Sequence, residues 1–154
     1  DAAVAAYETV YAKSWKDPEP FPAFNAALIR ATAELGVLRL GLWWVGDVPA
    51  AAQFWIVEHG HATVLKLAHD EAFAEHSPGT VLTALMLRHL LDQEHVEEID
   101  FGRGDDAYKA GWAAQRRQRI GLLIANPWRP TGLAAMARHD LGRLVARYTS
   151  RPTL

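Results

Sequence analysis

Residues 62–91, ATVLKLAHDEAFAEHSPGTVLTALMLRHLL, join an apparent strand to an apparent helix through a turn of small residues. The apolar run Ala62–Ala68 predicts the strand, and the spacing of apolar residues from Thr80 to Leu91 predicts the helix. The turn His76-Ser77-Pro78-Gly79-Thr80 would leave backbone N–H groups pointing outward at the positive end of the helix dipole. Such a turn suits a phosphate or pyrophosphate group. An ordinary helix start, with Ser77 or Thr80 as the N-cap, would have the same sequence.

The residues before this stretch predict two helices and two more strands. Apolar residues recur at helical spacing in residues 3–15 and 22–35. The period then changes to two in Val37–Val45, and a second strand, Ala51–Glu58, follows the Gly46-Asp47 turn. Together with Ala62–Ala68, these strands predict an antiparallel meander joined by short turns.

The residues after the Thr80–Leu91 helix predict a crossover and a second group of elements. A short strand at Val96–Phe101 would lie parallel to the strand before the helix. We expect a short helix at Asp106–Ala114, a last strand near Gln118–Ala125 and a helix at Gly132–Tyr148. The sequence therefore predicts an α+β fold with a mixed, mostly antiparallel sheet flanked by helices, and residues 1–154 as a single domain.

The composition excludes several classes of protein. The chain has 154 residues, half of them hydrophobic and none of them Cys, which excludes disulfides and Cys-based sites. No apolar run approaches the length of a membrane span and no signal peptide is visible, so we expect a cytoplasmic protein.

The charge is unevenly distributed along the chain. Residues 1–102 carry 6 Lys/Arg and 15 Asp/Glu, a net −9, whereas residues 103–154 carry 10 and 3, a net +7. A basic C-terminal third could face a polyanion. The total of only −2 favours instead two parts that neutralise each other in one fold, so DNA is not expected as a partner.

Five short segments carry a resemblance to a known family. They are Ser14-Trp15-Lys16, residues 51–55 (AAQFW), residues 66–70 (KLAHD), residues 77–80 (SPGT) and residues 100–109 (DFGRGDDAYK), the last followed by Trp112. Together they resemble the GNAT-like acyltransferase domain of bacterial cellulose- and polysaccharide-biosynthesis proteins, a relative of Fem-type aminoacyltransferases. The resemblance implies a GNAT fold that lacks its first strand. It also implies that the chain is the C-terminal part of a longer protein, with an N-terminal half of similar fold as its partner.

The resemblance implies transfer of an acyl group, such as acetyl, from acyl-CoA to an amine or hydroxyl of a small molecule or saccharide, in polysaccharide or cell-envelope biosynthesis. The pyrophosphate of the donor would lie on Ser77, Pro78, Gly79 and Thr80, and its pantetheine arm along Lys66, Leu67 and Ala68. The usual GNAT phosphate motif has more glycines than this turn, which leaves open an aminoacyl-tRNA donor of the Fem type. A non-catalytic half that packs against a partner domain is the third alternative.

Four polar residues are candidates for the chemistry. The resemblance implies that Tyr108 protonates the leaving sulfur; the alternative is a half-buried Tyr with a satisfied hydroxyl. Asp100 interrupts an apolar strand, and His69 ends a strand, so each is a candidate base. An ion pair could equally explain Asp100, and a turn could explain His69. Lys109 could bind a phosphate or be a solvated helix lysine.

Two histidines have the spacing of metal ligands. His59 and His61 lie two residues apart, but they flank a glycine in an apparent hairpin turn. No fitting carboxylate lies nearby in the sequence. We therefore expect no metal, and acyl-CoA as the co-substrate.

Overall fold

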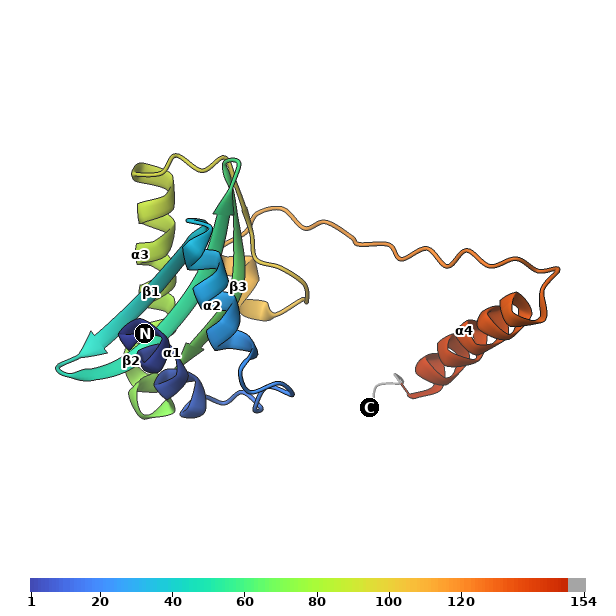
Figure 1. The fold of residues 1–154 in the computed structure, drawn as a ribbon, viewed down its shortest axis with the longest axis horizontal. Helices are drawn as coiled ribbons and strands as arrows, with labels where there is room; N and C mark the ends of the chain where they lie inside the picture. The colour runs from blue at the N-terminus through green and yellow to red at the C-terminus, as the bar shows by residue number, and fades with distance from the viewer. Residues whose placement is uncertain (150–154) are drawn as a thin grey trace. The chain divides into compact units, whose positions relative to one another are not determined.

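A computed structural model of the chain describes residues 1–149 and divides into two compact units (Figure 1). The first unit is Asp1–Ala114 and the second begins at Gln115. The single domain predicted for residues 1–154 stays a prediction, and its last five residues lie outside the described part of the chain.

The first unit contains one four-stranded sheet in the order β1-β2-β3-β4. The strands are β1 (Leu38–Val45), β2 (Val48–Glu58), β3 (His61–His69) and β4 (Glu98–Asp100). The first three strands are antiparallel and β4 pairs with β3 in parallel, which confirms both the meander and the crossover. The His59-Gly60 turn has positive φ at both residues, as a tight hairpin turn between right-twisted strands requires.

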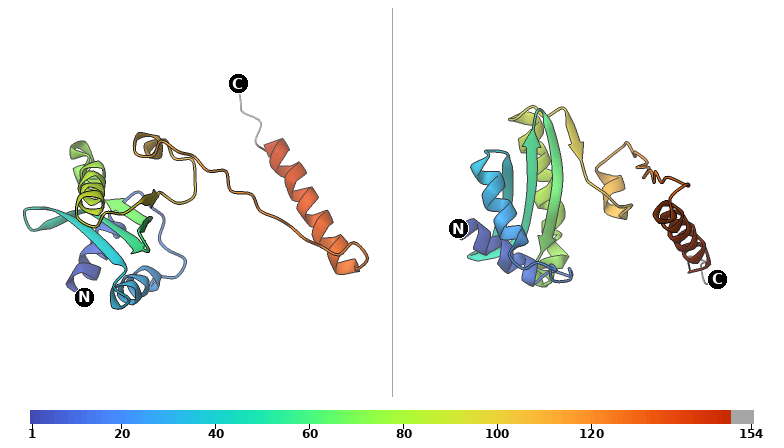
Figure 2. Two further views of the ribbon diagram at one scale, coloured as in Figure 1. Left: turned by 90° about the horizontal axis from the view of Figure 1, so that it is seen from above. Right: turned by 45° about the vertical axis from the view of Figure 1, so that its right-hand side comes forward.

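Helices cover the two faces of this sheet (Figure 2). The helices α1 (Ala2–Ala12) and α2 (Phe24–Glu34) lie on one face, and α3 (Pro78–Asp92) lies on the other. Strand β2 is buried on both faces because it is central: Phe54 packs with α1 and α2, and Trp55 with α3. The chain therefore has the α+β fold that the sequence predicts.

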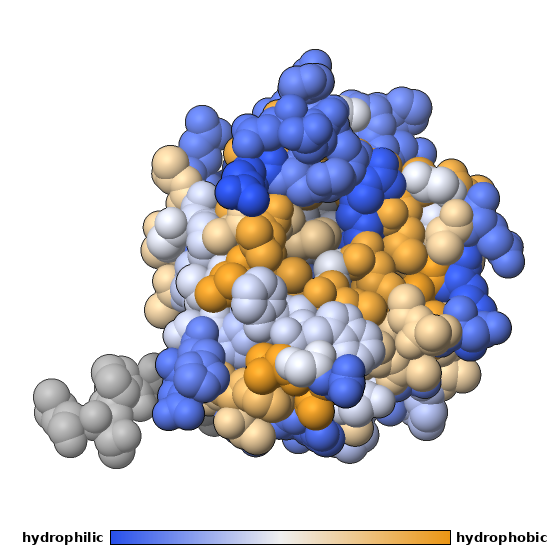
Figure 3. Space-filling model, turned by 90° about the vertical axis from the view of Figure 1, so that its left-hand side faces the viewer, coloured by the Kyte–Doolittle hydropathy of each residue, from blue (hydrophilic) through white to orange (hydrophobic). Residues whose placement is uncertain are grey.

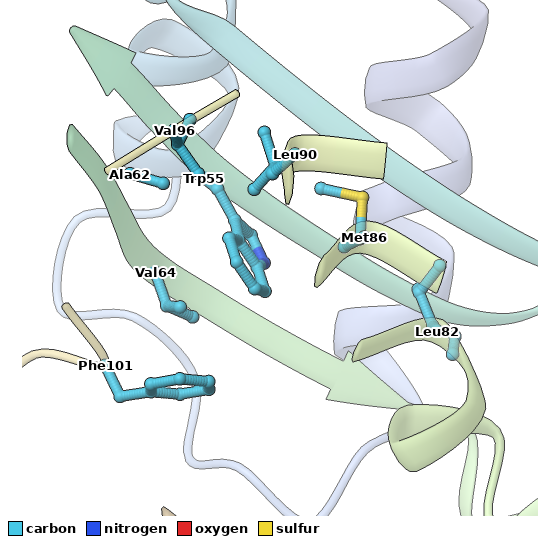
Figure 4. Close-up of a cluster of buried hydrophobic side chains, with 9 residues drawn as sticks. Trp55, Ala62, Val64, Leu82, Met86, Leu90, Val96 and Phe101 are labelled. Atoms are coloured by element: carbon cyan, nitrogen blue, oxygen red, sulfur yellow. The ribbon is translucent and has the colours of Figure 1, made fainter. Parts of the chain in front are cut away.

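The core on the α3 face forms around Trp55 (Figure 4). The ring of Trp55 meets that of Phe101 edge to face, with 6.0 Å between the ring centroids. Leu82, Met86 and Leu90 recur every fourth residue, so one stripe of α3 packs on the sheet. Gly41 permits this close packing, since a Cβ built there would lie 2.6 Å from the Sδ atom of Met86.

The end of the sheet at the β1–β2 turn carries exposed apolar side chains. Trp44, Val45 and Val48, around the β1–β2 turn, are each 40% or more exposed. Figure 3 shows apolar residues reaching the surface among polar ones on that side of the molecule.

None of the helices in residues 1–149 combines the length and apolar character needed to cross a lipid bilayer.

Two expectations about the later elements need correction. The helix expected at Asp106–Ala114 is a short 3₁₀-helix, η2 (Ala107–Gly111), and a second one, η1 (Glu71–His76), precedes α3. The strand expected near Gln118–Ala125 is wrong: these residues carry no strand. Their apolar pattern favours a strand, but the described residues of the second unit, 115–149, contain no partner strand. A lone strand would leave its backbone hydrogen-bonding groups unpaired.

In the described part of the second unit, residues 115–149, there is one helix. Helix α4 (Pro130–Thr149) confirms the helix expected at Gly132–Tyr148. The turn before it is fixed by Asn126, whose Oδ1 accepts a hydrogen bond from the Trp128 amide at 2.9 Å.

Candidate functional site

The pairing between β3 and β4 covers only the first three residues of β3, His61–Thr63. The last paired residues are Thr63 and Asp100, and the chain after β4 turns away through Gly102, which has a φ of 73°. Beyond Thr63, no strand within residues 1–149 pairs with the outer edge of β3. The backbone of Leu65–His69 on that edge can therefore pair with an extended ligand, as an added strand would.

A β-bulge lies in β3 at Leu65, two residues after the last pair with β4. Trp55 pairs with Val64 and Phe54 with Lys66, so Leu65 has no partner in β2. The extra residue reverses the sides taken by the residues that follow, and bulges often re-aim side chains next to active sites. Lys66 consequently shares the face of Phe54, towards α1 and α2, while Leu67 packs in the core under α3.

The turn before α3 has an unusual backbone. Ser77 adopts the left-handed conformation, with φ 49° and ψ 47°, and Pro78 after it is fully buried. The carbonyl of Ser77 accepts hydrogen bonds from the amides of Thr80 at 3.0 Å and Val81 at 3.1 Å. In the described structure the amide of Gly79 is the one N–H of this first turn without such a bond. The predicted phosphate turn thus offers one free amide together with the dipole of a 15-residue helix.

Gln53, on β2, forms hydrogen bonds to this turn. From the sequence it is named only as part of the AAQFW segment. Its side chain is fully buried on β2. The amide nitrogen Nε2 donates to the Gly79 carbonyl at 2.9 Å and to Thr83 Oγ1 at 2.8 Å. The oxygen Oε1 accepts from Trp55 Nε1 at 3.1 Å. An amide in an otherwise apolar central strand was the sequence signal for this role.

His69 lies beside the same turn. Its ring packs against Trp15, with 4.5 Å between the centroids, and its Nδ1 would lie 3.4 Å from a Cβ built on Gly79. Burial lowers the pKa of His69, although the charges of Glu71 and Asp70 oppose this effect. The imidazole is therefore neutral at neutral pH and can accept a proton. The contact with Trp15 is a feature that the sequence did not predict.

Lys66 forms an ion pair on the opposite face of the sheet. Its ammonium contacts the Glu19 carboxylate, which also accepts a hydrogen bond from the Tyr11 hydroxyl at 2.9 Å. The hydrogen bonds from Lys66 and Tyr11 lower the pKa of Glu19. The side chain of Lys66 is therefore engaged in an ion pair and does not extend along the open edge of β3. Lys66 can then contribute to ligand binding only through its backbone.

The residues after β4 are held by local contacts. Oδ1 of Asp100 accepts a hydrogen bond from the Gly102 amide at 2.7 Å. Lys109 pairs with Asp106 at 2.9 Å and also donates to the Arg103 carbonyl. Tyr108 is 44% exposed, and burial of the rest of its side chain raises the pKa of the phenol. The phenol is therefore protonated at neutral pH, as a proton donor must be.

The structure thus groups the predicted residues into three sets. His69 lies against the Gly79 turn, Tyr108 and Lys109 lie together on η2, and Asp100 ends β4 where the strands part. Burial and the charge of Lys66 lower the pKa of Lys16, while the charges of Glu19 and Asp106 oppose this shift. Within residues 1–149, no three His, Asp or Glu side chains are grouped as metal ligands.

Comparison with known proteins gives a family and several similar structures. The family model described as an acetyltransferase (GNAT) domain matches residues 1–110. An aminoglycoside antibiotic 6'-N-acetyltransferase from Acinetobacter haemolyticus has a TM-score of 0.59 at 11% identity, over 82% of this chain and 94% of that one. A putative acetyltransferase from Agrobacterium tumefaciens has a TM-score of 0.54 at 15% identity, over 81% and 94%. An acetyltransferase from Trypanosoma brucei has the same score at 11% identity, over 79% and 94%. The search of curated proteins finds no match.

Proposed function

This chain belongs to the acetyltransferase (GNAT) domain family, and from that membership we propose that it moves an acetyl group from acetyl-CoA to an amine or hydroxyl acceptor. The observation that carries the proposal is the open outer edge of β3 beyond Thr63, which lies next to the start of α3. An extended thioester arm needs such an edge, and a phosphate group needs such a helix start.

The donor would bind along β3 and across the turn before α3. The backbone of Lys66, Leu67 and Ala68 would pair with the pantetheine arm. The residues Ser77–Thr80 would hold the pyrophosphate through the Gly79 amide and the helix dipole, at about 0.3–1 kcal/mol for each favourable charge. Lys109 would add a positive charge, which its ion pair with Asp106 partly neutralises.

The reaction would be a direct attack of the acceptor on the thioester carbonyl. A bond forms from the acceptor nitrogen or oxygen to the carbonyl carbon, and the carbon–sulfur bond breaks. His69, which is neutral, or Asp100 would take the proton of the acceptor. Tyr108, which keeps its proton at neutral pH, would pass it to the leaving sulfur.

The acceptor that we propose is a saccharide or another small molecule of polysaccharide or cell-envelope biosynthesis, acetylated in the cytoplasm. The resemblance to polysaccharide-biosynthesis proteins supports this choice. The same resemblance supports an N-terminal half of similar fold as the partner of this chain. One of the similar structures is named as an aminoglycoside antibiotic acetyltransferase, so amino sugars are a sensible first set of acceptors.

Calorimetric titration with acetyl-CoA and with desulfo-CoA tests the donor site. We expect both to bind, and Gly79→Val to weaken binding because its branched side chain crowds the turn. Gly79→Ala is the matched control, since its Cβ would meet only His69, at an ordinary contact distance of 3.4 Å. Absence of binding at millimolar concentration would remove the proposal. Affinity for aminoacyl-tRNA that falls steeply with salt would favour the tRNA-dependent alternative.

A further inference from the structure

Helix α3 is fastened to the sheet by polar contacts at both of its ends. At the start, the side-chain amide of Gln53 donates to the Gly79 carbonyl and to Thr83 Oγ1. At the far end, Arg39 of β1 makes two hydrogen bonds to the Glu94 carboxylate, at 2.5 and 2.6 Å. The two fastenings differ in their surroundings, because Gln53 is fully buried whereas Arg39 and Glu94 are partly exposed.

Both N–H groups and the oxygen of the Gln53 side-chain amide form hydrogen bonds. Its two N–H groups take the Gly79 and Thr83 oxygens, and its Oε1 takes the Trp55 indole. The Thr83 hydroxyl in turn donates to the Gly79 carbonyl at 2.8 Å. That carbonyl therefore accepts side-chain hydrogen bonds from both Gln53 and Thr83. A fully satisfied buried network of this kind fixes a single geometry, because each loss leaves a buried polar group unpaired.

The Gly79 peptide is therefore fixed relative to β2, and through β2 relative to β3. Gln53 pairs with Leu67 of β3, in the middle of the open stretch Leu65–His69. One side chain thus connects the backbone edge that would hold the donor arm with the turn that would hold its pyrophosphate.

We propose that Gln53 is a positioning residue of the donor site, which sets the Gly79 turn at the correct distance from the open edge of β3. This inference rests on the proposed function. Gln53 itself does not touch the donor, since its side chain is covered by Gly79, Thr83 and Trp55. Its effect falls on the pyrophosphate half of the ligand and not on the pantetheine half.

Three variants of the full chain test the proposal. Gln53→Met keeps the length and neutrality of the side chain but has no N–H group for the Gly79 carbonyl. Gln53→Glu keeps the shape and places a carboxylate oxygen against that carbonyl; if its buried charge prevents folding, Gln53→Met still gives the result. Arg39→Met is the matched control, since it releases α3 from the sheet at the end away from Gly79.

The measurement compares two probes, CoA, which carries the pyrophosphate, and pantetheine, which lacks it, by calorimetry and by NMR titration. We expect Gln53→Met to weaken CoA binding about tenfold, the effect of one or two hydrogen bonds. The affinity for pantetheine should change by less than about twofold, which is a smaller effect than the loss of one hydrogen bond gives. Arg39→Met should leave both affinities unchanged. The Thr80 amide should also exchange its hydrogen faster in Gln53→Met without any ligand.

The outcomes separate this inference from the proposed function. If the unaltered chain binds CoA and the folded Gln53 variants bind it equally well, the positioning role is wrong and the proposed function stands. Equal losses for CoA and pantetheine would also overturn it, because they indicate general damage to the fold. If the unaltered chain binds neither probe, the donor site fails and the inference falls with it.

Discussion

At the scale of single residues, Ser77 is the point of greatest backbone strain near the site. It holds a left-handed conformation, and its side chain makes no cap hydrogen bond to α3. The left-handed conformation is unfavourable for a residue with a Cβ atom, and glycine removes that cost. We therefore expect Ser77→Gly to raise the free energy of unfolding by about 0.5 kcal/mol, after subtraction of the extra entropy that glycine gives the unfolded chain. Ser77→Ala, the control, should leave stability nearly unchanged. Urea titration checks both, and a less stable Ser77→Gly variant would contradict the reasoning.

His69 gives a prediction about pH. Burial lowers its pKa, so the unfolded chain binds a proton more readily than the folded chain does. Stability then rises with pH up to about 6.5, the ordinary pKa of histidine, and is lost as the pH falls below that value. We expect His69→Gln to lose less stability than the unaltered chain between neutral pH and about pH 5, the lower part of the histidine titration range.

The control for that experiment is His76→Gln, at a histidine whose side chain is 67% exposed. Thermal melts at several pH values give the difference between each variant and the unaltered chain. A pH dependence that His69→Gln leaves unaltered would show that burial of this imidazole does not affect stability.

At this scale the sequence predicted residue types better than it predicted contacts. The position of His69 at a strand end followed from the apolar run Ala62–Ala68, which is a local property. Its packing on Trp15 and the grip of Gln53 on Gly79 join residues far apart in the chain, and no local pattern contains them. The left-handed conformation of Ser77 could not be predicted from the sequence either, because serine rarely adopts it.

At the scale of elements, the sequence predicted those whose burial pattern is complete within a short segment. The alternation in β1 and the four-residue stripe of α3 each report one face of contact with the core. The bulge at Leu65 was not predictable, since it is defined only by the register against β2. The strand expected near Gln118–Ala125 failed for the same reason: a strand needs a partner, and apolar alternation does not supply one.

The packing of α3 on β1 depends on the absence of a side chain at Gly41. We expect Gly41→Ala to lower the free energy of unfolding by about 1–3 kcal/mol, because the added Cβ overpacks the core. The contact atoms are Met86 Sδ at 2.6 Å and Leu82 Cδ1 at 3.1 Å from the Cβ position. In a Met86→Ala background the same change should cost less, since the space is then vacant. Equal costs in both backgrounds, measured by urea unfolding, would contradict this explanation.

The segment between α1 and α2 is fastened to β3 by Glu19. Its carboxylate receives Lys66 and the Tyr11 hydroxyl, and both side chains of the ion pair are less than a third exposed. We expect Glu19→Gln to lower stability by about 1–2 kcal/mol, because the ammonium of Lys66 loses its charged partner. The change should cost less in a Lys66→Met background. If a double-mutant cycle in urea gives no coupling between the two positions, the ion pair does not stabilise the segment.

At the scale of the whole molecule, charge and core are divided at the same place. Residues 1–114 carry 8 Lys/Arg and 17 Asp/Glu, a net −9, and residues 115–154 carry a net +7. Both hydrophobic clusters consist of residues from the first unit alone, the last of them being Ala113. The candidate site also lies within the first unit, as does the match to the acetyltransferase family, which ends at residue 110.

We therefore expect a chain ending at Ala114 to fold by itself. Its sheet, its three α-helices and both clusters are complete, so thermal unfolding followed by circular dichroism should remain a single cooperative transition. Residues 115–154 alone should show weak helicity, since α4 packs in neither hydrophobic cluster of the described residues and isolated helices of about 20 residues are marginal in water. A shortened chain with no cooperative transition would show that the first unit needs the second to fold. A shortened chain that folds but no longer binds acetyl-CoA, when the full chain binds it, would instead make the second unit part of the donor site.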